Sequence, residues 1–441
     1  MLKLQILKLS LCALGFGIIG STCFAQNYTS WVVGSETSVD VEHEPGLVLM
    51  GGAGEMPEAM VWFLERAAGG DILVLRTSGS DAYNDYLYTD LGVDVNRVET
   101  IRFNNPNTSD DEYILNRIAE AEAIWLAGGD QFNYVQFWKD TPIEDALHAH
   151  VISKGGAIGG ISAGLAVLGF GYFAAGNGTV YSSEALQDPY NSNMDVRYGD
   201  FLRMPWMNSV TNDSHYDDPD RRGRHVTMLA RLITDHSIAA LGIGCNEYTA
   251  VCIAEDGFAH CYGEYPQYQE QVYFLRPTCL DVVGPTCTAG EPLDWGSEGT
   301  ALNVYVVDAT EPGNRGLDLN DWTTGVGGSW ENWWVEDGEL EMVAMDEVPN
   351  CPMSSVNRVE DLAHSVVDTR PTFELFLGPN NTVMMTISMD CDLMVADSSG
   401  RVIKTLGIFP KGTHSVELPN TFNCYVFSDK EGALKSTIIC R

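Results

Sequence analysis

The stretch GAIGGISAGLAVLGF, residues 156–170, decides the fold. A short apolar run typical of a buried strand leads into a small, apolar, helix-like run, and one hydroxyl, Ser162, lies at the junction. Residues 160–164 read G-x-S-x-G, a pattern that places a serine on a sharp strand-to-helix turn. Glycines are needed there because the backbones crowd, and the next amide, that of Ala163, can stabilise an oxyanion. The alternative is a serine that only caps the helix.

The same alternation of strand and helix extends outward from this turn. Strands are expected at 46–52, 71–78, 98–105, 123–130 and 155–162, and helices at 55–68, at 109–123 and through Lys154. Short apolar strands separated by helices indicate a parallel sheet covered on both faces. The sequence therefore predicts an α/β three-layer sandwich with a mostly parallel sheet. Its glycine-rich strand ends predict a site at the carboxyl edge of that sheet.

Four segments are expected along the 441 residues. Residues 1–25 have lysines, an apolar run and small residues before a cleavage point, as in a signal peptide. Residues 26–348 form the catalytic domain, 349–366 a linker and 367–441 a small all-β sandwich, which alternating apolar residues and turn signals indicate. No membrane span is expected after cleavage of the leader.

The formal net charge of −36 limits the partners of this chain. The negative electrostatic potential of such a chain repels phosphate backbones and anionic lipids, which disfavours binding to nucleic acids and membrane surfaces. No HExxH motif is present, and His148 and His150 stand two apart on a predicted helix, so they face different sides. We expect no metal and no cofactor.

Nine of the eleven cysteines follow residue 25, and an exported chain favours disulfides. In AVCIAEDGFAHCYG, residues 250–263, a two-residue turn at Asp256-Gly257 would place Cys252 directly across from Cys261. The short separation of such a pair suits a disulfide, and two buried free thiols are the alternative.

A serine nucleophile needs a base and an orienting acid. His215 lies in a polar loop, 211–226, and Glu247 stands at the end of an apolar strand, so these two are the first candidates. An α/β-hydrolase esterase would instead use His260 with Asp213 or Asp235. A third hypothesis is a non-catalytic glycan-binding surface protein, whose clustered tryptophans would form the platform: Trp322, Trp330, Trp333 and Trp334.

These motifs resemble the cyanophycinase and aspartyl dipeptidase family of serine peptidases. The resemblance spans residues 45–265 and rests on MGGAGE, AGGDQ, GGISAG, DSHY followed by RRGR, and GIGCNEYTA, in family order. It implies a fold of the class I glutamine amidotransferase type, with Ser162 as nucleophile, His215 as general base and then acid, and Glu247 as the orienting carboxylate. It also implies a second oxyanion amide near Gly129 and a substrate contact from Gln131.

The family resemblance also suggests a substrate. Cyanophycin is a polyaspartate that carries arginine on each side chain, and Arg222 and Arg224 match the residues that would bind its carboxylates. The chain departs from the family in the acidic insertion DDPD, 217–220, which would face substrate guanidinium groups, and in Thr227, where cyanophycinases have a further arginine. We expect hydrolysis of aspartyl or isoaspartyl bonds, with cyanophycin favoured over short isoaspartyl peptides as the substrate. The expected products of cyanophycin hydrolysis are aspartyl-arginine dipeptides.

The last 70 or so residues resemble the C-terminal sorting domain of the type IX secretion system of Bacteroidetes. FLGPNN, VADSSGRVIKT and GTHSVELP occur in the expected order, although the usual second proline after the asparagine is absent. The resemblance implies the type IX secretion machinery as a partner and a secreted or cell-surface protein of a Gram-negative bacterium.

Overall fold

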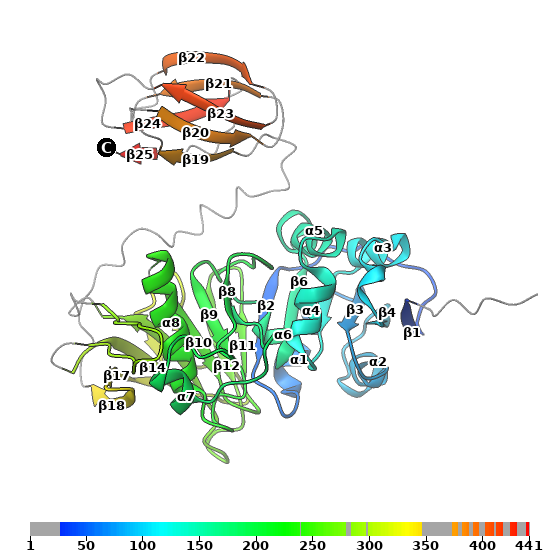
Figure 1. The fold of residues 1–441 in the computed structure, drawn as a ribbon. Coiled ribbons are helices and arrows are strands. Elements are labelled where there is room, and N and C mark those ends of the chain that lie inside the picture. The colour runs from blue at the N-terminus through cyan, green and yellow to red at the C-terminus, as the bar shows by residue number, and fades with distance from the viewer. Residues whose placement is uncertain are drawn as a thin grey trace, which may run out of the picture.

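The computed structural model describes residues 27–345, apart from 239, 279–283 and 297–298, and the backbone of seven strands between 373 and 440. The expected leader 1–25 and linker 349–366 lie outside the described residues. Two sheets and the helices around them form residues 27–345 (Figure 1). In this part of the chain, no helix combines the length and the apolar character that crossing a membrane requires.

The first sheet has ten strands in the order β1-β4-β3-β5-β6-β2-β11-β12-β15-β16. The strands β4, β3, β5, β6 and β2 are parallel neighbours, and antiparallel strands flank them on both sides. The bounds are β1 (Tyr28–Gly34), β2 (Gly46–Met50), β3 (Asp71–Arg76), β4 (Arg97–Phe103), β5 (Ala123–Leu126), β6 (Ala157–Ile161), β11 (Ala250–Ile253), β12 (Phe258–Tyr262), β15 (Gly316–Asp318) and β16 (Gly325–Val326).

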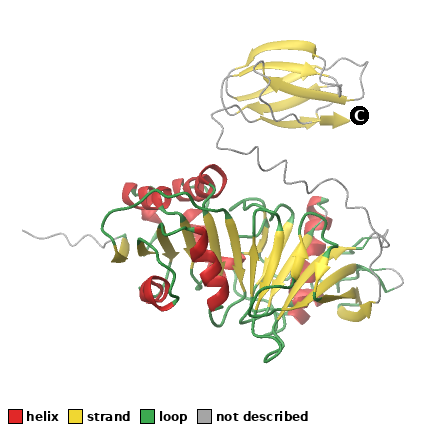
Figure 2. Ribbon diagram, turned by 180° about the vertical axis from the view of Figure 1, so that it is seen from behind, coloured by secondary structure: helices red, strands yellow, loops and turns green. Residues whose placement is uncertain are grey.

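Helices cover both faces of the parallel strands (Figures 1 and 2). Successive strand residues point to opposite faces, so Val48 packs under α1 and α2 whereas Leu49 packs under α3, α4 and α5. The helical segments are α1 (Pro57–Arg66), α2 (Ala82–Asp85), η1 (Tyr86–Asp90), η2 (Pro106–Thr108), α3 (Glu112–Glu120), α4 (Gln131–Trp138), α5 (Pro142–His148), η3 (Ala149–Lys154), α6 (Ala163–Ala166), α7 (Ser182–Gln187) and α8 (Arg222–His236). The expected three layers are present around these strands.

A second sheet of eight strands, in the order β18-β17-β14-β13-β10-β9-β7-β8, was not predicted. Only β7, β9 and β10 run parallel there, so the expectation of a mostly parallel sheet holds for strands β2 to β6 of the first sheet and fails for this sheet. Its strands are β7 (Gly171–Phe173), β8 (Val196–Tyr198), β9 (Val210–Asp213), β10 (Leu241–Cys245), β13 (Gln271–Pro277), β14 (Leu302–Asp308), β17 (Gly328–Glu336) and β18 (Glu339–Met345). One hydrophobic core joins both sheets through residues such as Leu49 and Phe274.

Two antiparallel sheets come from the carboxyl-terminal residues. The three-stranded sheet consists of β19 (Phe373–Leu377), β20 (Thr382–Ile387) and β23 (Gly412–Glu417). The four-stranded sheet consists of β21 (Cys391–Ala396), β22 (Val402–Phe409), β24 (Cys424–Asp429) and β25 (Ile438–Cys440). The described part of this segment is therefore built from strands.

The predicted Cys252–Cys261 disulfide is wrong. Cys252 is paired with His260 and Cys261 with Val251, one residue away from the predicted register. The reason is the loop: the amide of Gly257, at φ +82°, donates to Ala254, so the connection has three residues and not two. A shift of one residue turns a side chain to the other face, and the two buried thiols, both free, lie in different cores.

The tryptophan platform of the glycan-binding hypothesis is not formed either. Trp322 is 2% exposed and Trp333 is fully buried, and they belong to different hydrophobic cores. Trp330 and Trp334 are half-buried and pack against these two cores. The tryptophans therefore stabilise the fold around the second sheet.

Candidate active site

Ser162 lies on a strained turn between β6 and α6, with φ 55° and ψ −110°. The glycines on either side are required by close packing: a Cβ on Gly160 would lie 2.5 Å from the carbonyl carbon of Gly164, and one on Gly164 would lie 2.0 Å from the Leu126 oxygen. The Ser162 side chain makes no capping hydrogen bond to α6. The helix-cap alternative is therefore wrong, and the turn holds the hydroxyl out for another partner.

That partner is His215. The Ser162 hydroxyl is 2.7 Å from Nε2 of His215, and Nδ1 of the same ring is 2.6 Å from Oε1 of Glu247. If Nδ1 carries the proton and donates it to Glu247, Nε2 is left to accept from Ser162, which is the tautomer that a general base needs. The structure thus brings together the three residues that the sequence analysis selected, in the geometry of a serine, histidine and acid triad.

The triad draws on both sheets. Ser162 follows β6 of the first sheet, whereas His215 and Glu247 follow β9 and β10, which are parallel neighbours in the second. All three come from carboxyl ends of strands, where the sequence predicted the site. The His215 and Glu247 side chains are each 23% exposed, so substrate can reach a site that is largely shielded from water.

The loop after β2 holds this arrangement in place. The His215 amide donates to the Gly51 carbonyl at 2.9 Å, and the Tyr248 amide donates to the Gly52 carbonyl at 3.1 Å. Gly52 has φ +132°, and a Cβ there would lie 2.4 Å from Cε1 of the His215 ring. Only glycine allows the imidazole to lie this close to the loop.

A pocket of about 520 Å³ opens beside the nucleophile. It is lined by Ala53, Glu55, Arg76, Ala82, Tyr83, Tyr86, Gly128, Ile161, Ser162 and His215. The sequence analysis missed Glu55, Arg76, Tyr83 and Tyr86. A signal was available for two of them, since Arg76 ends the apolar run DILVLR and Glu55 ends MGGAGE, each a charge at the carboxyl end of a predicted strand.

Of the two residues expected to supply oxyanion amides, Ala163 directly follows Ser162, and Gly129 follows a glycine that lies beside Ser162. Ala163 begins α6 directly after Ser162 and is 2% exposed. A Cβ added to Gly128 would lie 3.6 Å from the Ser162 Cβ, so the turn before Gly129 lies beside the nucleophile. Backbone amides on both sides of Ser162 are the groups that stabilise a tetrahedral oxyanion.

Arg224, which we expect to bind substrate, has a carboxylate partner within the chain. Its Nε donates to Oδ2 of Asp213 at 2.9 Å and its Nη2 to Oδ1 at 2.5 Å, and both side chains are only 3% exposed. Burial alone would raise the pKa of Asp213, but the charge and hydrogen bonds of Arg224 hold it below its usual value. This guanidinium already has a carboxylate and does not face the pocket.

Gln131, Arg222 and the acidic insertion also have partners within the chain. Gln131 donates to the Phe173 carbonyl at 3.2 Å, and Arg222 donates to Asp220 at 2.6 Å. Asp217 accepts from the Glu247 amide at 2.9 Å. The insertion therefore supports the triad loop through Asp217, whereas we had expected it to face substrate cations, and neither Gln131 nor Arg222 lines the pocket.

The esterase alternative does not form a triad. The Asp213 carboxylate is occupied by Arg224, Asp235 accepts from Arg231 and Tyr190, and Nδ1 of His260 contacts the Gly313 carbonyl at 2.9 Å. Since Ser162 contacts His215, this hypothesis is wrong in its choice of residues.

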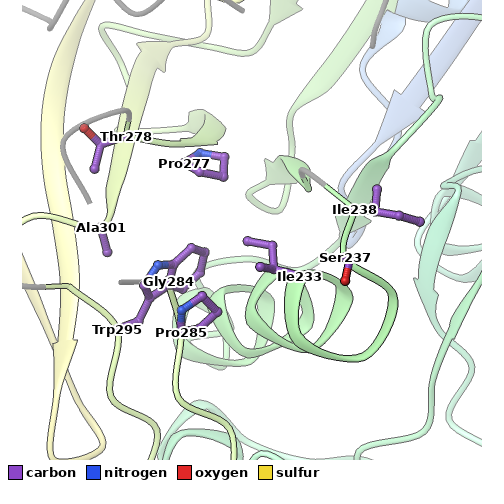
Figure 3. A pocket seen from close by; sticks show the side chains of 9 residues that line it. All are labelled: Ile233, Ser237, Ile238, Pro277, Thr278, Gly284, Pro285, Trp295 and Ala301. Atoms are coloured by element: carbon purple, nitrogen blue, oxygen red, sulfur yellow. The ribbon is translucent and has the colours of Figure 1, made fainter. Parts of the chain in front are cut away.

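A second pocket, of about 370 Å³, lies at the end of α8 (Figure 3). Its side chains are mostly apolar, including Ile233, Pro277 and Trp295, and none of its lining residues is an acid or a base. The described lining therefore offers the hydroxyls of Ser237 and Thr278 no acid or base to activate them. Within the described residues, no cluster of three or more His, Cys, Asp or Glu could hold a metal ion.

Part of this chain is similar in sequence to known peptidases. Residues 80–260 match Peptidase family S51. Cyanophycinase from Synechococcus elongatus is 29% identical over 243 residues, 52% of this chain and 69% of that protein. Cyanophycinase from Trichormus variabilis is 26% identical over 208 residues, 47% of this chain and 62% of that protein. A solved peptidase from an acI-B1 Actinobacterium aligns with 53% of this chain and 91% of its own, with 16% identity and a TM-score of 0.39. Together with the triad, these sequence matches identify the protein as a serine peptidase.

Proposed function

We propose that this serine peptidase hydrolyses aspartyl or isoaspartyl peptide bonds, with cyanophycin as the favoured polymer. The observation that carries the proposal is the contact between Ser162 and His215, 2.7 Å from oxygen to nitrogen, with Glu247 behind the ring. The substrate is supported by the ordered family motifs and by relatives named cyanophycinase. Export is part of the proposal, motivated by the leader-like residues 1–25 and the sorting-domain motifs.

The proposed mechanism begins with acylation. The Ser162 oxygen attacks the carbonyl carbon while Nε2 of His215 takes the hydroxyl proton. The charge that develops on the carbonyl oxygen is stabilised by the Ala163 amide and by the turn at Gly128 and Gly129. Glu247 stabilises the imidazolium, which then gives its proton to the leaving amine as the carbon–nitrogen bond breaks. The product is an ester between the substrate acyl group and Ser162.

Deacylation repeats these steps with water. His215 takes a proton from the water as its oxygen attacks the ester carbon, and the protonated ring then returns that proton to the Ser162 oxygen when the ester bond breaks. The acid product leaves and the free serine is restored. Every proton in this cycle moves through Nε2, so the orientation set by Glu247 matters in both halves.

The first experiment tests catalysis and substrate together. Purified protein is incubated separately with cyanophycin, isoaspartyl dipeptides, aspartyl dipeptides and simple esters. We expect release of aspartyl-arginine dipeptide from the polymer, reduced roughly 10⁴-fold or more in both Ser162→Ala and His215→Ala. His260→Ala is the matched control and should keep full activity, because His260 contacts the Gly313 carbonyl and does not line the pocket.

A serine-directed phosphonate separates the nucleophile from the substrate assignment. Labelling at Ser162 that disappears in His215→Ala supports the triad whatever the substrate is. Turnover confined to dipeptides would move the assignment to a dipeptidase, and turnover confined to esters would refute it. Full activity of His215→Ala would contradict the mechanism.

A further inference from the structure

The pocket beside Ser162 contains one cation that no carboxylate neutralises. Arg76, at the end of β3, donates from Nε to the Ser78 carbonyl and from Nη1 to the Ser80 carbonyl, the latter at 2.5 Å. A guanidinium has five N–H donors, so three remain for other partners. Among the residues that the structure describes, no Asp or Glu forms an ion pair with Arg76. Its charge therefore remains available to the pocket that it lines.

The Arg76 side chain is held in a fixed direction. The loop that accepts its hydrogen bonds contains Gly79 at φ +81°, where a Cβ would lie 2.3 Å from Nη2. The guanidinium carbon also lies 5.8 Å from the centre of the Tyr83 ring. A guanidinium surrounded in this way is pre-organised, unlike that of a mobile surface arginine, which lowers the entropy cost of binding a carboxylate.

The same pocket contains a carboxylate that pairs with no cation among the described residues. Oε1 of Glu55 accepts from the Tyr83 hydroxyl at 2.6 Å, which fixes its position without neutralising its charge. The Tyr86 hydroxyl, which also belongs to this pocket, is buried without a hydrogen-bond partner. Burial first, and then the charge of Glu55, raise the pKa of Tyr86 to about 12, so its oxygen stays protonated at neutral pH.

Two opposite charges thus line one pocket without pairing with each other. Arg76 comes from the end of β3 and Glu55 from the loop after β2; Tyr83 contacts both, with its ring toward Arg76 and its hydroxyl on Glu55. We infer that Arg76 binds a substrate carboxylate and that Glu55 binds a substrate cation, next to the bond that Ser162 attacks. This inference rests on the proposed function and deepens it. The pocket then selects acyl compounds that carry an anion and a guanidinium or ammonium group close to the scissile carbonyl.

The inference assigns to Arg76 the role that the sequence analysis gave to Arg224. In cyanophycin the side chain of each aspartyl unit carries an arginine, whose carboxylate supplies the anion and whose guanidinium supplies the cation, both near the scissile backbone carbonyl. A neutral peptide would leave both pocket charges without partners, which is unfavourable once water is excluded. Charge-assisted hydrogen bonds of this kind change affinity roughly ten- to a hundredfold.

The test compares variants of the full chain on matched short polyaspartates that contain one backbone aspartyl bond to cleave. The aspartyl side chain before that bond carries arginine in the first substrate, leucine in the second, and arginine with a carboxamide in place of its carboxylate in the third. We expect Arg76→Gln to lower kcat/KM roughly ten- to a hundredfold on substrates that keep this carboxylate, and by less than threefold on the carboxamide. Glu55→Gln should lower kcat/KM on the arginyl substrate and spare the leucyl one.

The control is Arg102→Gln. Arg102 also donates to the 78–80 loop, from Nη1 to the Gly79 carbonyl at 2.8 Å, but it does not line the pocket. We expect this variant to affect all three substrates equally. Loss of the same size on every substrate in Arg76→Gln, with a lowered melting temperature, would show a structural role and overturn the inference.

A second readout keeps the pocket testable if no aspartyl bond is cleaved. Ser162 is labelled with phosphonates that carry an anion, a cation, both or neither. The wild-type protein should react fastest with the doubly charged reagent, and Arg76→Gln should lose the preference for the anion. Equal rates for all four reagents would overturn the inference, whereas absent labelling in wild-type protein would instead refute the triad mechanism.

Discussion

Backbone strain is concentrated in the residues around the nucleophile. Ser162, His215, Tyr248 and Ala53 all have positive φ angles, between 49° and 62°, although none of them is glycine. Each such conformation costs of order 1 to 3 kcal/mol and persists only where the surroundings enforce it. Here the loop after β2 does so, by accepting the amide hydrogens of His215 and Tyr248. The hydroxyl and the imidazole are therefore aligned before substrate arrives.

We expect Gly52→Ala to disable this alignment. The added methyl group would lie 2.4 Å from Cε1 of His215, so the ring must move away from Ser162. A displacement near 1 Å costs roughly a hundredfold in kcat. The measurement is kcat on the best substrate, with phosphonate labelling of Ser162 as a second readout.

Gly92→Ala is the control for Gly52→Ala. Gly92 also has positive φ, +71°, but its added methyl group meets no atom within 4 Å. The Gly92→Ala variant should lose stability because of backbone strain, and its kcat should stay unchanged because the methyl group contacts no neighbouring atom. Equal kcat for the two variants would show that Gly52 does not position the imidazole.

The three residues of the triad could be selected from the sequence, whereas the substrate residues could not. Ser162 ends one predicted strand, Glu247 ends another, and the ordered family motifs around DSHY added His215. Which arginine faces the pocket depends on contacts between distant segments. Arg224 is occupied because β9 delivers Asp213 beside α8, and no local pattern reveals that pair.

At the scale of elements, the ion pair between Asp213 and Arg224 joins β9 to α8. It is almost fully buried, and Arg224 also stacks on Phe173, 4.4 Å from the ring centre. We expect Arg224→Met to destabilise the fold by about 3 to 5 kcal/mol, because the Asp213 carboxylate would stay buried without a partner. Chemical denaturation measures this free energy of unfolding.

The exposed neighbour provides the comparison for Arg224→Met. Arg222 and Asp220 are partly exposed, with 32% and 47% of their side chains accessible, so Arg222→Gln should cost about 1 kcal/mol or less. If Arg224→Met were as stable as Arg222→Gln, the buried pair would not anchor α8.

The elements also show where sequence periodicity fails. The five parallel strands were predicted because each is short and apolar and most of them are followed by a helix. The antiparallel β13, β14 and β17 lack helices between them and were missed. In the β11–β12 hairpin the strands were correct, but an error of one residue in loop length placed the two cysteines on one face, whereas they lie on opposite faces.

At the scale of the whole molecule, β18 marks where the two-sheet unit ends. It is the edge strand of the second sheet and pairs with β17 up to Met345. We expect a chain ending at Val348 to keep the melting temperature and the kcat/KM of the full chain, because both sheets remain complete. A chain ending at Asp337 should melt lower, since it lacks β18. Loss of folding after truncation at Val348 would show that the carboxyl-terminal strands stabilise the peptidase.

Because the nucleophile belongs to one sheet and its base and acid to the other, neither half of the molecule can cut a peptide by itself. Ser162 precedes His215 and Glu247 in the chain, so during synthesis the hydroxyl has no base until β9 and β10 have packed beside the first sheet. Peptidase activity is therefore coupled to completion of the fold.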